Sequence, residues 1–268
     1  MHPSLYPFNS KRRQQLQLSL YEAIGGEKME RLYINQVRLE PIDECSYVSN
    51  LPVVRWLLKT GKLEFTSNVT FFIGENGTGK STIIEAIAIC AGFNAEGGLR
   101  NFNFSTRQTC SDLYKYMTIS RAAHEKDGFF LRAESFYNVA TQVDELRLNL
   151  DGYGGLSLHE QSHGESFMSL VQHRFRGNGL YILDEPEAAL SPLRQMQLLS
   201  EMKRLVDKKS QFIIATHSPI ILAYPGAVIY QITEEGVQQV EYQECDNYII
   251  TKQFLEAPER MIHYLFDS

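Results

Sequence analysis

Residues 74–82 read Gly-Glu-Asn-Gly-Thr-Gly-Lys-Ser-Thr, and this stretch decides the fold. It fits the pattern G-x-x-x-x-G-K-[ST]. An apolar run ends just before it at Ile73, and residues 79–92 follow with apolar side chains at helical spacing. Glycines allow such a loop to turn its backbone N–H groups toward phosphate oxygens, and the start of a helix adds partial positive charge. A chance glycine-rich turn is the alternative, but the strand and helix flanks argue against it, so the stretch predicts a nucleotide-binding loop.

Each residue of this loop is a predicted nucleotide contact. The set is Gly74, Glu75, Asn76, Gly77, Thr78, Gly79, Lys80, Ser81 and Thr82. The ammonium group of Lys80 would reach the β- and γ-phosphates, and the hydroxyl of Ser81 would be a ligand of Mg²⁺. The loop therefore predicts a nucleoside triphosphate bound together with Mg²⁺.

Two adjacent acids, Asp184 and Glu185, end the buried strand that we expect at residues 180–185. Neighbouring side chains on a strand point to opposite faces, but the backbone bends where the strand ends. Asp184 can then face Mg²⁺, and Glu185 can act as the base that polarises an attacking water. A solvated strand end is the alternative interpretation, and the neighbouring phosphate loop makes it the weaker one.

Two further motifs are weak when each is taken singly. Residues 161–166 read Gln-Ser-His-Gly-Glu-Ser before a predicted helix, where Ser162 and Gly164 could bind an anion and Glu165 would lie in the first turn. The ordinary interpretation of that pattern is a helix N-cap. His217 follows another buried strand and is, by itself, an ordinary loop residue. Both motifs gain weight only from their order and spacing.

The motifs together resemble those of the ABC-type ATPases. GENGTGKST resembles Walker A, QSHGES a variant of the LSGGQ signature, and LYILDEP Walker B with its catalytic glutamate. EAALSP at residues 187–192 is similar to the D-loop, and ATHSP to the loop of the switch histidine. The intervals agree as well, because Ser162 precedes Asp184 by 22 residues and His217 follows Asp184 by 33. More narrowly, the chain resembles the small stand-alone AAA-family ATPases of bacteria, which are kin to the ATPase heads of SMC, RecF and OLD proteins.

This resemblance implies that the nucleotide is ATP and that the activity is ATP hydrolysis with Mg²⁺, with Glu185 and His217 as the catalytic residues. It also implies that two subunits enclose ATP between them. Ser162 and Gly164 of one subunit would touch the γ-phosphate that Lys80 of the other holds. We therefore expect a homodimer that forms in the presence of ATP, with Glu165 also in its nucleotide-binding segment.

The chain departs from the family pattern in two places. The signature reads His163-Gly164-Glu165 where the family has Gly-Gly-Gln, and an acid near ATP is unexpected unless it faces the helix. No glutamine stands where the family has its Q-loop, and the residue there is Glu134, a candidate Mg²⁺ or water contact or else an exposed strand end. Tyr47 is a candidate for stacking on adenine, beside the ordinary alternative of a core or surface tyrosine.

The expected fold is α/β: a P-loop NTPase with an ABC-ATPase-like core and a mixed sheet. An antiparallel β layer would come from the N-terminal strands and residues 113–134, with strands at 113–119 and 128–134 on either side of a turn. A small helical lobe would occupy residues 135–178. Residues 1–28 would form an N-terminal arm and residues 29–268 a single domain. Other expected elements are a strand at 31–39, two strands within 62–74, helices at 164–175 and from Pro192 to about Lys208, a strand at 211–216, a hairpin turning near 234–236 and a helical tail.

Composition narrows the class of protein further. The 268 residues carry a net charge of −6, which gives no bulk basic character typical of nucleic-acid binding. No apolar run is long enough to span a bilayer or act as a signal peptide, so we expect a soluble, cytoplasmic protein without membrane contact. The four cysteines are scattered and lack metal-ligand spacing.

Three functions remain open at this point. The first is an ATPase acting on DNA in repair or anti-phage defence, as the resemblance suggests. The second is an ATP-gated interaction module that controls a partner effector protein. The third, a small-molecule kinase, is weaker because that chemistry needs neither the signature nor the switch histidine. Six arginines could form a basic face for DNA, although scattered arginines are usually solvated: Arg100, Arg107, Arg121, Arg132, Arg174 and Arg176.

Overall fold

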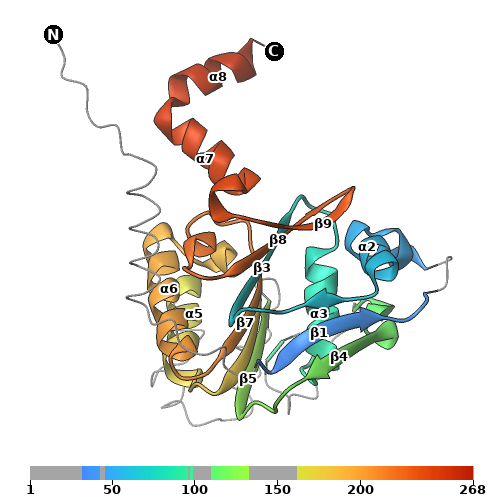
Figure 1. Ribbon diagram of the computed structural model, residues 1–268. Helices are drawn as coiled ribbons and strands as arrows, with labels where there is room; N and C mark the ends of the chain where they lie inside the picture. Colours follow the sequence, from blue (N-terminus) through green and yellow to red (C-terminus); the bar gives the residue numbers. More distant parts are fainter. Residues whose placement is uncertain (1–31, 43–45, 96, 99–109, 133–161, 268) are drawn as a thin grey trace, which may run out of the picture. The chain divides into compact units, whose positions relative to one another are not determined.

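Buried strands build a six-stranded mixed sheet in the computed structural model, which describes residues 32–42, 46–95, 97–98, 110–132 and 162–267 (Figure 1). All of these residues belong to one compact unit, Arg31–Ser268. The strand order is β5-β6-β7-β3-β8-β9. The bounds are β3 Val69–Gly74, β5 Asp127–Arg132, β6 Gly179–Asp184, β7 Gln211–Ala215, β8 Val228–Thr233 and β9 Gly236–Val240. The first five strands of this order run parallel, and only β9 pairs antiparallel, with β8.

Helices cover both faces of the sheet, so the central strands β6, β7 and β3 are buried on both sides. Phe71 and Ile73 enter one core together with residues of α5 (His163–Ser169) and α6 (Pro192–Val206), whereas Phe72 between them enters the other. That second core contains α3 (Lys80–Cys90) and α2 (Pro52–Thr60). Figure 1 shows these helix pairs on opposite sides of the sheet. The predicted α/β fold with a mixed sheet is confirmed.

A second, smaller sheet lies on the α3 side. It is antiparallel, in the order β2-β1-β4, and consists of β1 Ile34–Leu39, β2 Leu63–Glu64 and β4 Met117–Arg121. Gln211 of β7 joins the two sheets, because its amide accepts a hydrogen bond from Ile34 N (2.9 Å) and donates one to Ile34 O (2.8 Å). This contact is fully buried, with Gln211 only 1% exposed.

One part of the predicted antiparallel layer is wrong. Within residues 113–134, β4 pairs antiparallel with β1 as expected, whereas β5 leaves that layer and pairs in parallel with β6 of the larger sheet. The reason is burial, since Phe129 and Leu131 enter one core and Phe130 the other, which requires cover on both faces. Residues Asp112–Tyr116 form a 3-10 helix in place of the start of the first strand.

Most other predicted elements are confirmed within one to three residues, including the helix that Pro192 begins and the hairpin of β8 and β9. The helix expected at 164–175 is α5 for its first part and then a π-helix, Leu170–Arg174. Helix α2 was not anticipated. The tail is helical, with α7 at Asp246–Glu256 and α8 at Pro258–Phe266. Short 3-10 helices complete the described chain: η1 Tyr47–Asn50, η6 Pro186–Ala189, η7 Ile221–Ala223 and η8 Tyr242–Glu244.

The predicted arm at residues 1–28 and the part of the helical lobe at 135–161 lie outside the described residues. The division of the chain into arm, domain and lobe therefore stays a prediction. Across the described ranges, none of the helices combines the length and apolarity needed to cross a membrane.

The Gln211 contact gives a test of how the two sheets are joined. In Gln211→Ala, the buried N–H and C=O of Ile34 lose their partners, and we expect the free energy of unfolding to fall by about 2–4 kcal/mol. Urea denaturation measures this change. Gln238→Ala, at an exposed position on β9, is the matched control and should change it by less than about 0.5 kcal/mol. Equal urea midpoints for Gln211→Ala and Gln238→Ala would contradict the role of Gln211 in joining the two sheets.

Candidate nucleotide-binding site

The loop between β3 and α3 begins at a residue that must be glycine. Gly74 has φ +146°, a conformation that other residues rarely adopt. A Cβ atom at this position would lie 2.3 Å from the carbonyl oxygen of Ile232 on β8. The parallel neighbour strand thus sets where the loop leaves the sheet, as the sequence pattern predicts for a phosphate-binding loop.

Lys80 begins α3 and is nearly buried, at 4% exposed. Its Nζ donates hydrogen bonds to the carbonyl oxygens of Gly74 (2.7 Å) and Glu75 (2.8 Å), and Thr78 Oγ1 donates to the same Glu75 oxygen (2.8 Å). Burial lowers the pKa of Lys80, while nearby carboxylates, first among them Glu185, act in the opposite direction. The ammonium group is therefore held in place by its own loop, where the oxygens of a polyphosphate could replace the carbonyls.

Ser81 and Asp184 face each other across the site. Ser81 Oγ donates a hydrogen bond to Asp184 Oδ1 (3.1 Å), and Asp184 is 5% exposed at the end of β6. Arg132, opposite Asp184 in the β5–β6 register, places Nε 3.6 Å from Asp184 Oδ2 and forms an ion pair with Glu85 of α3. The network around the acid thus joins α3 to the ends of two strands.

The Ser81–Asp184 pair fits a magnesium ion, because hydroxyl and carboxylate oxygens are the protein ligands that this ion accepts. The described residues contain no group of three or more His, Cys, Asp or Glu side chains that could hold a metal by themselves. An ion held by this pair would therefore take its remaining ligands from phosphate and water. Glu134, the other predicted metal contact, lies outside the described residues.

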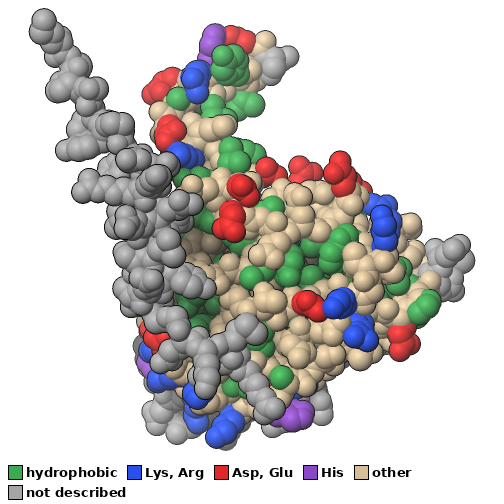
Figure 2. All heavy atoms as spheres, viewed as in Figure 1, with side chains coloured by type: hydrophobic (Ala, Val, Ile, Leu, Met, Phe, Trp, Pro, Cys, Tyr) green, Lys and Arg blue, Asp and Glu red, His purple; other side chains and the backbone are tan. Residues whose placement is uncertain are grey.

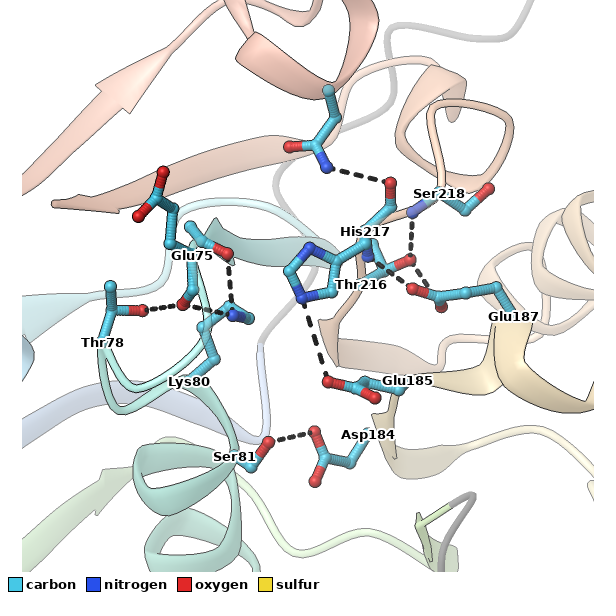
Figure 3. A network of polar contacts seen from close by, with 12 residues as sticks. Glu75, Thr78, Lys80, Ser81, Asp184, Glu185, Glu187, Thr216, His217 and Ser218 are labelled. Carbon is cyan, nitrogen blue, oxygen red and sulfur yellow. Dashed lines mark hydrogen bonds and ion pairs between the residues drawn. The ribbon is translucent and has the colours of Figure 1, made fainter. Parts of the chain in front are cut away.

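Glu185 and His217 approach each other from neighbouring strand ends (Figure 3). Glu185 has a left-handed backbone (φ +52°), uncommon for a residue other than glycine, and its N–H donates to Ala215 O of β7 (2.9 Å). Its Oε1 lies 3.9 Å from Nε2 of His217. Nε2 has no hydrogen-bond partner among the described residues. A strained backbone thus directs a carboxylate toward a buried imidazole nitrogen whose hydrogen-bonding capacity the described residues leave unused.

Two residues that the sequence analysis missed hold the backbone of His217. The carboxylate of Glu187, in η6, accepts hydrogen bonds from His217 N and from Thr216 Oγ1 (2.7 Å). Asn247 Nδ2, in the first turn of α7, donates to His217 O (3.0 Å). Glu187 stands in the D-loop motif, which could have drawn attention to it. Asn247 follows His217 by 30 residues and belongs to no motif.

The signature segment begins α5, and its acid is turned toward its own helix. Glu165 Oε2 accepts hydrogen bonds from Ser162 N (3.0 Å) and Ser162 Oγ (2.6 Å), and Oε1 lies 3.1 Å from Nη2 of Arg194. The hydrogen bonds from Ser162, followed by those from Arg194, lower the pKa of Glu165. A Cβ at Gly164 would lie 2.8 Å from Ala189 O, so α5 packs closely on η6. The unexpected acid is thus a helix cap paired with an arginine.

A model of the protein family described as "AAA domain" matches residues 54–215. The match covers more than half of the chain and includes the phosphate loop, the signature segment and Asp184–Glu185. The chain belongs to this AAA domain family. Membership supports binding and hydrolysis of ATP, and the resemblance predicted from the motifs is confirmed at this level. A comparison with curated proteins gives no match.

Among solved structures, this AAA domain is similar to ATP-binding cassettes and to SMC heads. For cbiO1 of Clostridium perfringens, part of the ABC transporter complex cbiONQ, the TM-score is 0.46 and the identity 18%, covering 88% of this chain and 99% of that one. For the SMC head domain of Thermotoga maritima, the values are 0.43 and 16%, with 78% and 100% covered. For an ATP-binding cassette of an ABC transporter, they are 0.48 and 14%, with 84% and 98% covered.

The structure of this AAA domain brings together Lys80, Ser81, Asp184, Glu185 and His217 (Figure 3). The other loop residues flank them, with Glu75, Asn76 and Gly77 exposed and Thr82 half-buried in α3. Tyr47 begins η1 and is 65% exposed, so it is not part of the core.

The position of Lys80 generates a binding prediction. In Lys80→Ala, the phosphates lose their main point charge, and we expect affinity for a fluorescent ATP analogue to fall by about 100-fold or more, because charged hydrogen bonds contribute about 1.5–3 kcal/mol each. Equilibrium titration by fluorescence anisotropy measures it. Lys62→Ala, an exposed lysine beside β2, is the control and should bind as the unmodified chain does. Unchanged affinity in Lys80→Ala would remove the loop assignment.

Proposed function

We propose that this AAA domain hydrolyses ATP with Mg²⁺ and that two copies enclose the nucleotide between them. The observation that carries the proposal is the convergence of Lys80, the Ser81–Asp184 pair and the Glu185–His217 pair at the carboxyl ends of three adjacent strands, β6, β7 and β3. In parallel sheets this edge is the usual place for a ligand.

Each group has a distinct task in the proposed reaction. Lys80 and the loop N–H groups bind the β- and γ-phosphates. Ser81 and Asp184 would hold Mg²⁺, whose charge would offset that of the phosphate oxygens. Glu185 takes a proton from the attacking water. The oxygen of that water forms a bond to the γ-phosphorus, and the bond between the γ-phosphorus and the bridging oxygen breaks, so that ADP leaves. His217 Nε2, 3.9 Å from that carboxylate, is placed to hydrogen-bond the γ-phosphate.

The role of Glu185 is tested by Glu185→Gln. The amide keeps the shape of the carboxylate but cannot take a proton, so we expect ATP binding to persist while kcat falls by about 100-fold or more. A coupled phosphate-release assay measures turnover. Glu235→Gln, exposed in the turn between β8 and β9, is the matched control and should leave kcat unchanged. If Glu185→Gln turns over ATP at nearly the rate of the unmodified chain, Glu185 is not the general base, and His217 or Glu134 becomes the candidate.

The dimer follows from what a single phosphate loop can cover. One loop binds one side of a triphosphate, and donors for the other side must come from elsewhere. Ser162 and Gly164 begin α5 with an exposed serine, and they match the family segment that contacts ATP from a second subunit. Arg194, paired with Glu165, offsets the negative charge of that acid beside the phosphate.

The dimer proposal is tested in the Glu185→Gln background, where bound ATP persists. We expect light scattering to report a doubling of mass on adding ATP, and Ser162→Arg to abolish the doubling while the monomer still binds ATP, because the bulky cation blocks the contact. Ser200→Arg, exposed on α6, is the control and should still double. A rate of hydrolysis per chain that is independent of protein concentration, without any mass change, would sink the sandwich arrangement.

A specific observation favours a second candidate function, control of a partner effector protein. Helices α7 and α8 contain no buried residue, and Figure 2 shows apolar side chains over them at the top of the view. The large apolar residues that they expose are Ile250, Phe254, Leu255, Ile262, Tyr264, Leu265 and Phe266. Such a surface is typical of a protein-binding site.

A role on DNA, in repair or anti-phage defence, is carried over from the family resemblance. Three of the six arginines predicted as a basic face form ion pairs within the chain: Arg121 with Glu125, Arg132 with Glu85 and Arg174 with Asp127. Arg176 is exposed, and Arg100 and Arg107 lie outside the described residues. The effector role is therefore better supported by the described surface than the DNA role.

A further inference from the structure

We infer that Glu187 and Asn247 are positioning residues that fix the backbone of His217 from two sides and so hold its imidazole beside Glu185. The inference rests on the proposed function, because it concerns how the reaction site is ordered. Its starting point is the pair of contacts already described: the Glu187 carboxylate accepts from His217 N, and Asn247 Nδ2 donates to His217 O.

The need for such support comes from where His217 stands. It lies two residues beyond the end of β7, where the ladder of hydrogen bonds no longer fixes the chain. A backbone without partners there could move by about 1 Å, and a displacement of that size at a reacting group can cost about 100-fold in rate. Because both polar groups of the His217 backbone are bonded, the position of its Cα and the direction of its Cα–Cβ bond are set.

Glu187 acts from the side of the acids. Its two carboxylate oxygens bond the His217 N–H and the hydroxyl of the fully buried Thr216, and that hydroxyl oxygen in turn accepts from Ser218 N (3.0 Å). A single side chain thus orders the turn from Thr216 to Ser218. It stands two residues after Glu185 in the chain, so the segment that carries the proposed base also carries the residue that bonds the His217 N–H.

Asn247 acts from the opposite side, at the start of α7. The helix start is itself anchored, since Asp246 Oδ2 accepts from Gln231 Nε2 of β8 (2.7 Å). Tyr242, just before α7, adds a hydrogen bond from its hydroxyl to Pro219 O (2.9 Å). Asn247 therefore bonds His217 from a helix start that is anchored to the sheet. Its side-chain amide is the group that links α7 to the site.

The decisive experiment measures kcat and KM for ATP hydrolysis by the full chain carrying Asn247→Ala or Glu187→Ala. We expect kcat to fall about tenfold or more with KM within twofold, because ATP binding uses the phosphate loop and only the approach of His217 is disturbed. Glu187→Gln keeps one acceptor oxygen and should retain more activity than Glu187→Ala. Gln253→Ala, exposed on α7, is the matched control and should change neither value.

A double-mutant cycle separates positioning from a general loss of structure. If Asn247 acts through His217, Asn247→Ala should have no further effect on kcat in a His217→Ala background. The same fold-loss in both backgrounds would overturn the inference, and so would a rise in KM without a fall in kcat.

A readout independent of hydrolysis keeps the inference apart from the proposed function. The imidazole NMR signal of His217, assigned by its absence in His217→Ala, should shift or broaden in Asn247→Ala and stay in place in Gln253→Ala. An unchanged signal in Asn247→Ala would overturn the inference even in an active enzyme. Full turnover by Glu185→Gln together with a shifted signal would instead reject the assigned base and leave the positioning contacts standing.

Discussion

Burial of the Lys80 ammonium group is the constraint on which the rest of the site depends. A charge that is 4% exposed needs compensation, and here it comes from two carbonyl oxygens of its own loop and from the field of nearby carboxylates. Those carbonyls can face inward only because the loop leaves β3 through Gly74, pressed against the backbone of β8. The loop conformation, the sheet and the charge therefore determine one another.

The parallel sheet then brings distant parts of the sequence to that charge. Strand β7 lies next to β3 in the sheet and β6 lies next to β7, so the carboxyl ends of β6 and β7 bring Asp184 and His217 to the start of α3. The hydrogen bond between Ser81 and Asp184 spans 103 positions of the chain and ties this helix to the end of β6. Two acids are tolerated at the end of this apolar strand for different reasons. Ser81 and Arg132 pair with Asp184, whereas solvent reaches Glu185.

How far the sequence predicts this molecule depends on whether an interaction is local. The phosphate loop, the acids after β6 and the histidine after β7 each follow a buried strand, and strand ends are visible in apolar patterning. The strand that pairs with β5 is not visible in this way. The apolar run Phe129–Leu131 could belong to either sheet, and only the burial of both of its faces assigns it to the larger one. Asn247 was missed for a related reason: an amide in a polar helix start has no pattern, and its meaning comes only from a carbonyl 30 residues earlier. Glu165 shows the reverse case, since a departure from the family signature became intelligible once Arg194, 29 residues later, was seen beside it.

The contacts around His217 also connect the site to two surfaces. On one side, the start of α5 packs on Ala189 of η6, and the same short helix carries Glu187, which bonds the His217 N–H. On the other side, Asn247 bonds the His217 carbonyl from α7, whose remaining turns expose Ile250, Phe254 and Leu255. The start of α5 thus reaches the backbone of His217 through η6, and α7 reaches it directly. If the proposed second copy binds at α5 and the proposed effector binds α7, both contact elements that bond or pack against the support of one histidine backbone, and hydrogen bonds weaken steeply with distance and angle.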